Sequence, residues 1–421
     1  MTGEFGHILL IGIVAVSILL MLVRPRDIPE VWWVGAGALL LVVLRLIPVQ
    51  LAGKAVAAGT DVYLFLIGMM ILSELARENG VFDWVSSAAV RHCGNSTARL
   101  FTLIYAAGTI VTIAMSNDAT AVVLTPAVLG AVKKAKVEPL PALFACAMIA
   151  NAASFVLPIS NPANLVVFHT GMPPLGRWLA MFLLPSLLSI AATYAVLRLY
   201  FRKELSARIE CDMKEEPLAT DGKLVLAGLA LVVAVLLVAS ALHWDLGLPT
   251  CLAALVITGA VAIKQKSNPL RLAKEVSWST LLLVAALFVL VDALESLGLL
   301  RHTQAALLWA QHQPIATGTL LTGFTVGILN NLVNNLPLGL VAGATVQAAH
   351  VQGLLTNAVL IGVDLGPNLS VTGSLATILW LLAMRKEGQN VSAWAFLKVG
   401  ALAMPVALLA ALGGLLLQRA L

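Results

Sequence analysis

Two aspartates stand inside polar interruptions of apolar segments, and they are the side chains best suited to carry chemistry. Asp118 follows Asn117 in SNDATAVVLTP (116–126), and Asp364 opens DLGPNLSVTGS (364–374). A carboxylate at the centre of a membrane helix costs about 2.5 kcal/mol or more, so it needs either a function or a structural partner. A buried carboxylate can exchange protons or accept hydrogen bonds from a polar solute. The structural alternative is that these acids cap freed helix ends.

Amide and hydroxyl side chains gather at the same two interruptions and at two others, SFVLPISNPAN (154–164) and NNLVNNLP (330–337). Broken helices expose backbone carbonyls and amides and present helix-dipole ends, so such a site binds a polar solute with few charged side chains. No Arg or Lys falls at the four breaks, which argues against a strongly anionic substrate. Asn and Ser also join membrane helices structurally, so only their clustering favours function. The candidate proton-coupling residues are Asp118 and Asp364, and the candidate substrate-binding residues are Asn117, Asp118, Thr120, Ser154, Ser160, Asn161, Asn164, Asn334, Asn335, Asp364, Asn368, Thr372 and Ser374.

The composition predicts an all-α polytopic membrane protein. Sixty per cent of the 421 residues are apolar and 11% are charged, whereas about a quarter of a soluble domain is charged. The predicted spans include 7–23, 31–49 and 223–241, each of which is apolar and long enough to cross roughly 30 Å of hydrocarbon. Such segments imply a lipid bilayer around the chain. The net charge of +5 is spread over short loops rather than gathered in a patch, so we expect it to orient the chain in the membrane, and we expect no nucleic-acid partner. The four cysteines and seven histidines lack metal-ligand spacing, and we expect neither a metal site nor a cofactor.

The chain also contains an internal duplication. LARENG, ending at Gly80, corresponds to LESLG, ending at Gly298, and the pair Asn117–Asp118 corresponds to Asn334–Asn335 at nearly the same spacing. We predict two inverted-topology repeats, each with five spans of which one is a broken helix, plus a re-entrant hairpin. The first repeat covers 1–201 (hairpin 98–133, broken helix 139–169), a cytoplasmic linker covers 202–222, and the second repeat covers 223–421 (hairpin 314–350, broken helix 353–385).

The charge distribution predicts the orientation. Five spans per repeat is an odd number, so the second repeat must be inverted relative to the first. With the N-terminus outside, most of the 26 Lys and Arg residues fall on the inner side, as the positive-inside rule requires. We therefore expect a multi-pass protein of the cell (inner) membrane with both termini outside.

The motifs VNNLP (333–337) and IGVDLGPNLSVTGSLATILW (361–380) are similar to those of the ArsB-type arsenite and antimonite efflux permeases of the ion-transporter superfamily. SNDATAVVLTP matches the corresponding segment of that family, and the order of spans and hairpins agrees over nearly the whole chain. Some relatives carry cysteine immediately before the aspartate of the DLGP motif. Here that residue is Val363, which puts cysteine-mediated transport in doubt.

This resemblance implies export of trivalent arsenic or antimony from the cytoplasm in exchange for protons, with some members associating with an ArsA-type ATPase. It also implies a site that includes Asn117, Asp118, Asn335 and Asp364. Arsenite at neutral pH is a small uncharged trihydroxide, which amides, hydroxyls and a carboxylate acceptor can hold. The oligomeric state is left open.

Three other functions compete with this interpretation. A sodium/proton antiporter on the same fold is the nearest, because aspartate, asparagine and open carbonyls also suit Na⁺. A passive channel would differ in failing to accumulate its solute. An intramembrane aspartyl protease would need a G-x-G-D motif, but the chain reads Ile361-Gly362-Val363-Asp364, so we expect no enzyme.

Overall fold

The computed structural model describes residues 4–169, 171–207, 217–268, 270–298 and 300–420, and the regular elements in these ranges are helical. The α-helices of the first half are α1 (Glu4–Val23), α2 (Glu30–Val43), α3 (Val49–Ala58), α4 (Thr60–Glu78), α5 (Val81–Arg91), α6 (Thr97–Ala114), α7 (Thr125–Lys134), α8 (Leu140–Ala152), α9 (Pro162–Val167) and α10 (Leu175–Tyr200). Those of the second half are α11 (Thr220–Ala241), α12 (Gly247–Gln265), α13 (Leu270–Glu275), α14 (Trp278–Ser296), α15 (Leu300–Gln311), α16 (Ile315–Val333), α17 (Asn335–Ala348), α18 (Leu354–Leu365), α19 (Leu375–Lys386) and α20 (Ala393–Ala420).

Many of these helices suit a lipid environment. Eight of the helices described are long and apolar enough to cross a membrane, and the bent pair α3 and α4 brings the number to nine. Large apolar side chains such as Leu231, Val256 and Ile263 are exposed on the outside of the helix bundle. Water would disfavour such a surface, whereas lipid chains accept it. The chain is an all-α multi-pass membrane protein.

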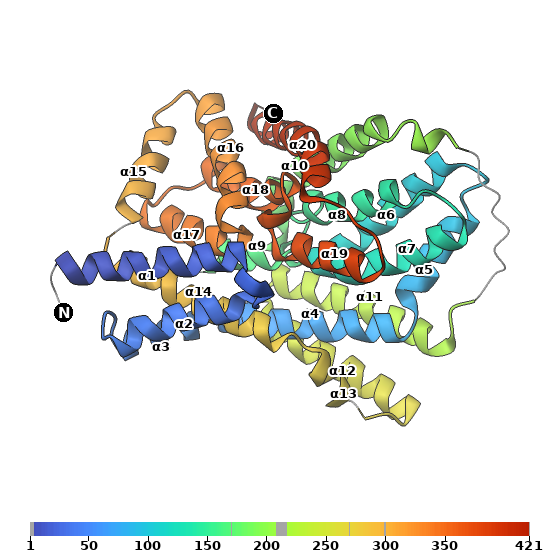
Figure 1. The fold of residues 1–421 in the computed structure, drawn as a ribbon, viewed down its shortest axis with the longest axis horizontal. Helices are drawn as coiled ribbons and strands as arrows, with labels where there is room; N and C mark the ends of the chain where they lie inside the picture. The colour runs from blue at the N-terminus through green and yellow to red at the C-terminus, as the bar shows by residue number, and fades with distance from the viewer. Residues whose placement is uncertain (1–3, 170, 208–216, 269, 299, 421) are drawn as a thin grey trace.

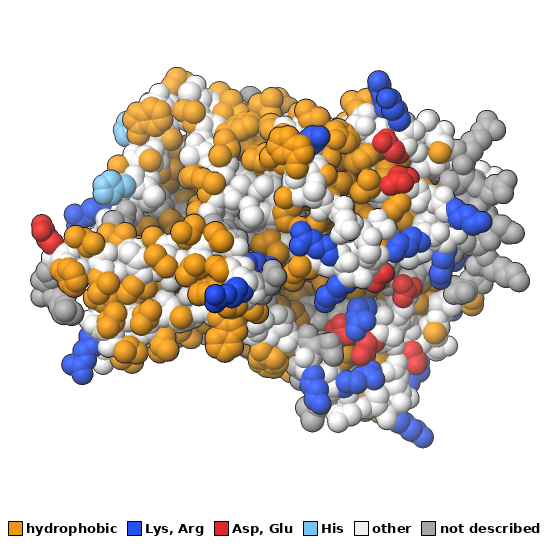
Figure 2. All heavy atoms as spheres, viewed as in Figure 1, with side chains coloured by type: hydrophobic (Ala, Val, Ile, Leu, Met, Phe, Trp, Pro, Cys, Tyr) orange, Lys and Arg blue, Asp and Glu red, His pale blue; other side chains and the backbone are white. Residues whose placement is uncertain are grey.

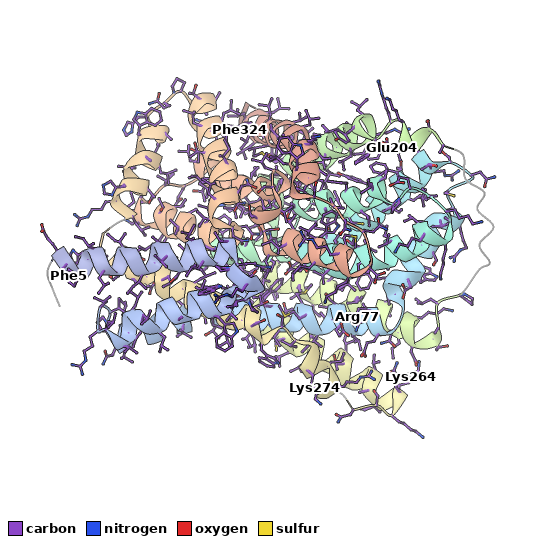
Figure 3. The ribbon with its side chains drawn as sticks, in the orientation of Figure 1. Phe5, Arg77, Glu204, Lys264, Lys274 and Phe324 are labelled. Atoms are coloured by element: carbon purple, nitrogen blue, oxygen red, sulfur yellow. The ribbon has the colours of Figure 1, made fainter. Side chains whose placement is uncertain are left out.

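Charged side chains gather on one side of the molecule. Hydrophobic side chains cover most of the left and central surface in Figure 2, whereas Lys, Arg, Asp and Glu are concentrated toward the right, near α5, α7 and α11 of Figure 1. Figure 3 places Phe5 at the left end and Arg77 and Lys264 toward the right. The described ends of the predicted linker 202–222 lie on this side, and its central residues 208–216 lie outside the described ranges.

The prediction of one span over 31–49 was wrong at its C-terminal end. α2 ends at Val43, and Pro48 then precedes a separate helix, α3. Arg45 has a φ of 54° in the turn between them, a left-handed conformation that ends a right-handed helix. Apolar composition continues through this turn, so hydropathy alone could not reveal the break.

Local sequence explains why the chain breaks where it does. In the range 98–133, α6 and α7 are joined by a π-helical turn (Ala119–Leu124), with Pro126 at the start of α7. In 314–350, Asn334 separates α16 from α17 with a φ of 80°. In 139–169 and 353–385, 3₁₀ turns beginning at or containing Pro158 and Pro367 interrupt the helices. Proline lacks the N–H that an α-helix requires.

The two halves pack across one another. α9, the second part of the first broken helix, lies against α17 of the second half. Reciprocally, α19 of the second broken helix lies against the π-helical turn Ala119–Leu124 of the first half. The last helices of the halves, α10 and α20, also pack side by side. The helix order of the first half thus recurs in the second, while the inversion of one half and the re-entry of the hairpins stay predictions.

Candidate functional site

Asp364 lies at the centre of the polar region. It stands one residue before the end of α18, and its side chain is 0% exposed. Its Oδ1 accepts a hydrogen bond of 2.8 Å from Asn161 Nδ2, whereas Oδ2 has no hydrogen-bond partner among the described residues. A buried carboxylate oxygen without a donor is costly. This oxygen is therefore available to a proton or to a solute that donates.

The first broken helix supplies the partner of Asp364. Asn161 Oδ1 accepts from Ala163 N at 3.0 Å and so caps the N-terminus of α9. Asn164 Nδ2 donates to the carbonyl oxygens of Ser154, Leu157 and Pro158 at 2.9 to 3.3 Å. The break is thus held open by its own asparagines.

The hydroxyls at this break have mainly local partners. Ser154 Oγ donates to Asn151 O at 2.8 Å and lies beside the Asp364 carboxyl. Ser160 Oγ donates to Ile113 O at 3.1 Å, which joins the break to α6. Of these two hydroxyls, only that of Ser154 adjoins the buried acid.

A pair of asparagines joins the two broken helices directly. Asn151 Nδ2 donates to Asn368 Oδ1 at 2.9 Å, and Asn368 Nδ2 donates to Met148 O at 3.0 Å. Asn368 is one of the predicted site residues, but Asn151 was missed. It lies three residues before the recognised motif, at the end of an apolar run, so its polarity within that run was the available signal.

The second hairpin is fastened to the second broken helix. Asn334 Nδ2 donates to Thr372 O at 3.3 Å, and Thr372 Oγ1 donates to Asn331 O at 3.0 Å. Two residues absent from the predicted set make the closest connections: Asn330 Nδ2 donates to Val363 O at 2.5 Å, and Asn331 Nδ2 donates to Gly366 O at 3.0 Å. Both belong to the NNLVNN motif, so the motif was recognised while these two side chains were overlooked.

Glycine at the DLGP motif permits this close approach. A Cβ on Gly366 would lie 2.6 Å from Gly327 O, and one on Gly373 would lie 2.5 Å from Pro367 Cα. Backbone atoms cannot retreat as a flexible side chain can. Any larger residue would therefore separate the hairpin from the broken helix.

The first hairpin holds its acid differently. Asp118 is half-buried and makes no hydrogen bond or ion pair with any residue in the described ranges, Asp364 included. Asn117 beside it is buried, and its Oδ1 has no partner there. Thr120 shares a 2.8 Å hydrogen bond with Thr112 inside the hairpin. The structure therefore does not bring the two aspartates into direct contact.

Two predicted residues complete the set. Ser374 caps α19 by accepting from Thr377 N at 3.1 Å. Asn335, the first residue of α17, is buried, and its Oδ1 has no partner in the described part of the chain. Ser374 thus has a structural role in holding the helix end, whereas Asn335 presents an unused acceptor.

Unused acceptors are the common feature of the breaks. At and next to the breaks, buried amide and carboxylate oxygens that lack a hydrogen-bond partner among the described residues belong to Asn117, Asn151, Asn164, Asn330, Asn335 and Asp364, whereas the unpartnered buried oxygens elsewhere are mostly hydroxyls such as those of Ser186 and Thr193. Every one of these amide and carboxylate oxygens accepts hydrogen bonds, and none donates when the aspartate is ionised. Such a set fits a solute with hydroxyl donors, a proton or a small cation.

An ion pair also adjoins the second hairpin. Arg24 pairs with Glu30 across the turn between α1 and α2. Glu30 lines a narrow cleft together with Asn334 and Pro337. The Arg24–Glu30 pair thus lies near the break at 330–337, which contains no Lys or Arg of its own. The Glu30 carboxylate partly offsets the charge of Arg24.

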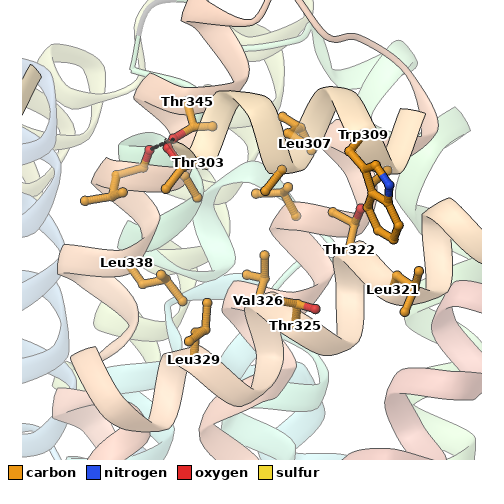
Figure 4. Close-up of a pocket in the computed structure, with 15 residues that line it drawn as sticks. Thr303, Leu307, Trp309, Leu321, Thr322, Thr325, Val326, Leu329, Leu338 and Thr345 are labelled. Carbon is orange, nitrogen blue, oxygen red and sulfur yellow. Dashed lines mark hydrogen bonds between the residues drawn. The ribbon is translucent and has the colours of Figure 1, made fainter. Parts of the chain in front are cut away.

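The apolar groove in Figure 4 has a different character. It runs between α15, α16 and α17 and is lined by side chains such as Leu307, Trp309 and Leu329. Apart from the Trp309 indole, its polar side chains are threonines, of which Thr303 and Thr345 bond each other at 2.8 Å. Such a surface suits lipid chains rather than a polar solute. In the residues described, no group of three or more His, Cys, Asp or Glu is placed to hold a metal ion.

Apolar helices on the outside and broken helices meeting around a buried carboxylate define a multi-pass membrane transporter. The chain belongs to the citrate transporter family, whose sequence profile matches residues 17–363. That match ends one residue before Asp364, so it does not include the DLGP motif.

Curated relatives cover nearly the whole chain. The arsenical pump membrane protein of Yersinia enterocolitica is 28% identical over 405 residues, which is 91% of this chain and 92% of the relative. The protein of the same name from Escherichia coli strain K12 is 28% identical with the same coverage. A putative arsenical pump membrane protein of Bacillus subtilis is 22% identical and covers 94% of this chain and 96% of its own length. The similarity thus extends through both halves.

A solved structure shares the fold. The crystal structure of the YdaH transporter from Alcanivorax borkumensis aligns with a TM-score of 0.54 at 16% identity, covering 88% of this chain and 86% of that one. At this identity the likeness concerns the fold alone. The resemblance to ArsB-type transporters inferred from the motifs is confirmed by these comparisons together.

Proposed function

We propose that this protein is a secondary active transporter that exports trivalent arsenic or antimony from the cytoplasm in exchange for protons. The observation that carries the proposal is the set of unused acceptor oxygens at the breaks. Uncharged arsenous acid has three hydroxyl groups that can donate to such oxygens. The names of the curated relatives favour the same cargo.

The charge of the breaks favours this cargo over a carboxylate solute. No Arg or Lys occurs in the four break sequences, and the nearby Arg24 is paired with Glu30. An anion with several charges would need cationic partners in a water-poor site. An uncharged trihydroxide would not.

In this proposal the two aspartates have separate tasks. Asp364, held by Asn161, orients the solute and exchanges its proton when the cargo leaves. Asp118, which lacks a partner among the described residues, takes up and releases protons as the hairpins and broken helices move against the other spans. The polar neighbours Asn117, Asn164 and Asn335 contribute acceptors.

The topology that goes with this function has both termini outside, in the inner membrane, with inverted halves. The gathering of Lys and Arg at the end where the linker joins the halves supports it. Cargo would then enter from the charged side and leave from the opposite side.

Transport into inverted membrane vesicles tests the proposal. With an acidic vesicle interior, arsenite should accumulate, and collapse of the proton gradient should abolish accumulation. Citrate serves as the control cargo and should not accumulate. Proton efflux triggered by Na⁺ with no arsenite accumulation would instead identify a sodium/proton antiporter, since acceptor oxygens also suit Na⁺. Equilibration without accumulation would indicate a channel.

A further inference from the structure

A second polar cavity lies apart from the buried aspartate. It has a volume of about 310 Å³ and is bordered by the end of α9, the start of α10 and the turn between α17 and α18. The polar side chains that line it are those of Arg177, Gln347, His350, Gln352, Thr356 and Asn357. None of these residues belongs to the four breaks. Its lining includes donors as well as acceptors, so it can contact a small polyhydroxy solute.

Asn357 is the feature that marks this cavity as a binding site. Its side chain is only 6% exposed, and its amide makes no side-chain hydrogen bond with any residue of the described ranges, although it borders the cavity. Buried amides normally find partners in the protein. An amide left for the cavity is available to its contents.

Asn357 and Asp364 lie on one face of α18. They are seven residues apart, which is two helical turns, or about 10 Å along the axis. α9 links the same two places, because Asn161 at its N-terminus bonds Asp364 and Val167 at its other end lines the cavity. The cavity and the buried Asp364 carboxylate therefore lie one after the other along both α18 and α9.

A thin apolar contact between α9 and α17 separates the cavity from Asp364. A Cβ on Gly343 of α17 would lie 2.6 Å from Val167 O of α9. One on Gly339, a turn earlier, would lie 3.4 Å from a methyl group of Val167 and 3.6 Å from one of Val363. The backbones of α9 and α17 thus touch at Gly343, with valine side chains filling the space toward Asp364.

We infer that the cavity is the outer vestibule of the transport path, a transient site for a small uncharged polyhydroxy solute. In it Asn357 makes the polar contact and the α9–α17 contact at Gly343 is the closed outer gate. The inference rests on the proposed function for the cargo and on the proposed topology for the outward direction. The existence of the cavity and of the α9–α17 contact depends on neither proposal, and thiol labelling tests access to both without any cargo.

Thiol accessibility tests the vestibule. In a chain whose four native cysteines are replaced by serine, the Asn357→Cys variant is exposed to a charged, membrane-impermeant thiol reagent added to intact cells. We expect modification from outside, whether or not the chain moves arsenite, and in a chain that does transport arsenite the modification should also block transport. The matched control is Val359→Cys, which lies two residues on and lines the apolar groove, where a charged reagent should not react. Lack of reaction at position 357, or reaction only from the inner side, overturns the inference.

The gate is tested by two glycines one turn apart. In the chain whose four cysteines are replaced by serine, labelling of Asn161→Cys measures access of the reagent to the surroundings of Asp364. Adding Gly343→Ala should raise its labelling rate from outside by about tenfold or more, because the open population grows, whereas Gly339→Ala, whose Cβ meets ordinary contacts, should leave the rate unchanged. Equal labelling rates in these two variants would falsify the gate. Because labelling needs no cargo, a protein that labels as expected but moves no arsenite refutes the proposed function and not the vestibule.

Discussion

The first hairpin and the second broken helix each carry one aspartate, but they hold it in different ways. Asp364 is fully buried and accepts a 2.8 Å hydrogen bond from Asn161 of the other half. Asp118 is half-buried and has no hydrogen bond or ion pair in the described part of the chain. A carboxylate fixed by a hydrogen bond suits orientation of a solute, and a carboxylate without such a partner suits proton exchange. The two halves thus hold their aspartates asymmetrically.

The largest effect is expected from Asp364→Asn. It removes the only charge among the unused acceptors at the centre of the site, and hydrogen bonds to charged groups are worth about 3 kcal/mol at most, so arsenite transport should fall roughly 100-fold. Initial rates in inverted vesicles measure it. Asp292→Asn on α14 is the control, because that acid lies at no break. Retention of half the rate in the Asp364 variant would contradict the assigned role.

Asp118→Asn should reduce the transport rate less than Asp364→Asn does, and it should also change how transport responds to the proton gradient. Transport should fall about tenfold, as for loss of a positioned proton-transfer group, and the residual flux should no longer respond to an imposed proton gradient. The measurement is the ratio of rates with and without the gradient. An unchanged ratio would assign proton coupling to Asp364 alone.

The contact between the halves is tested by comparing two helix caps. Asn161→Ala and Ser374→Ala each remove an N-cap worth about 1 kcal/mol, but only the first also removes a hydrogen bond to a carboxylate, worth about 2 kcal/mol. Asn161→Ala should therefore lower the melting temperature in detergent more and slow transport more than Ser374→Ala does. Equal effects would show that the Asn161 contact with Asp364 adds nothing to the cap.

The smallest effect is expected from Thr120→Val. The Thr120 hydroxyl bonds Thr112 at 2.8 Å and also approaches Gly108 O, so its loss should cost about 1 kcal/mol of stability and leave the KM for arsenite unchanged. Thermal unfolding and concentration-dependent uptake measure the two quantities. A tenfold rise in KM would instead return Thr120 to the substrate-contact set, where the sequence pattern had placed it.

Much of the local structure was predictable because its causes are local. Pro158, Pro367 and Asn334 mark places where helices end, since proline removes a donor and asparagine tolerates a positive φ. The break between α2 and α3, inside the single span predicted over 31–49, was missed because apolar residues continue through the turn at Arg45. Asn151 and Asn330 were overlooked because a single amide in an apolar helix has many structural explanations.

The sequence could not predict which side chains contact one another at the candidate site. Asn161 and Asp364 are 203 residues apart, and the Arg24–Glu30 pair reaches the second hairpin only through the packing of the turn between α1 and α2. Sequence spacing says nothing about which of four polar breaks face one another.

By itself, the sequence determined that this protein is a helical membrane protein with polar breaks in both halves, because hydropathy, proline and asparagine act over a few residues. Only the tertiary structure decided that α9 crosses to α17 while α19 crosses to the first hairpin, and so which acid is held and which is not. Those choices depend on backbone approaches such as that of Gly343 to Val167. Such approaches are properties of packed surfaces and not of any one segment.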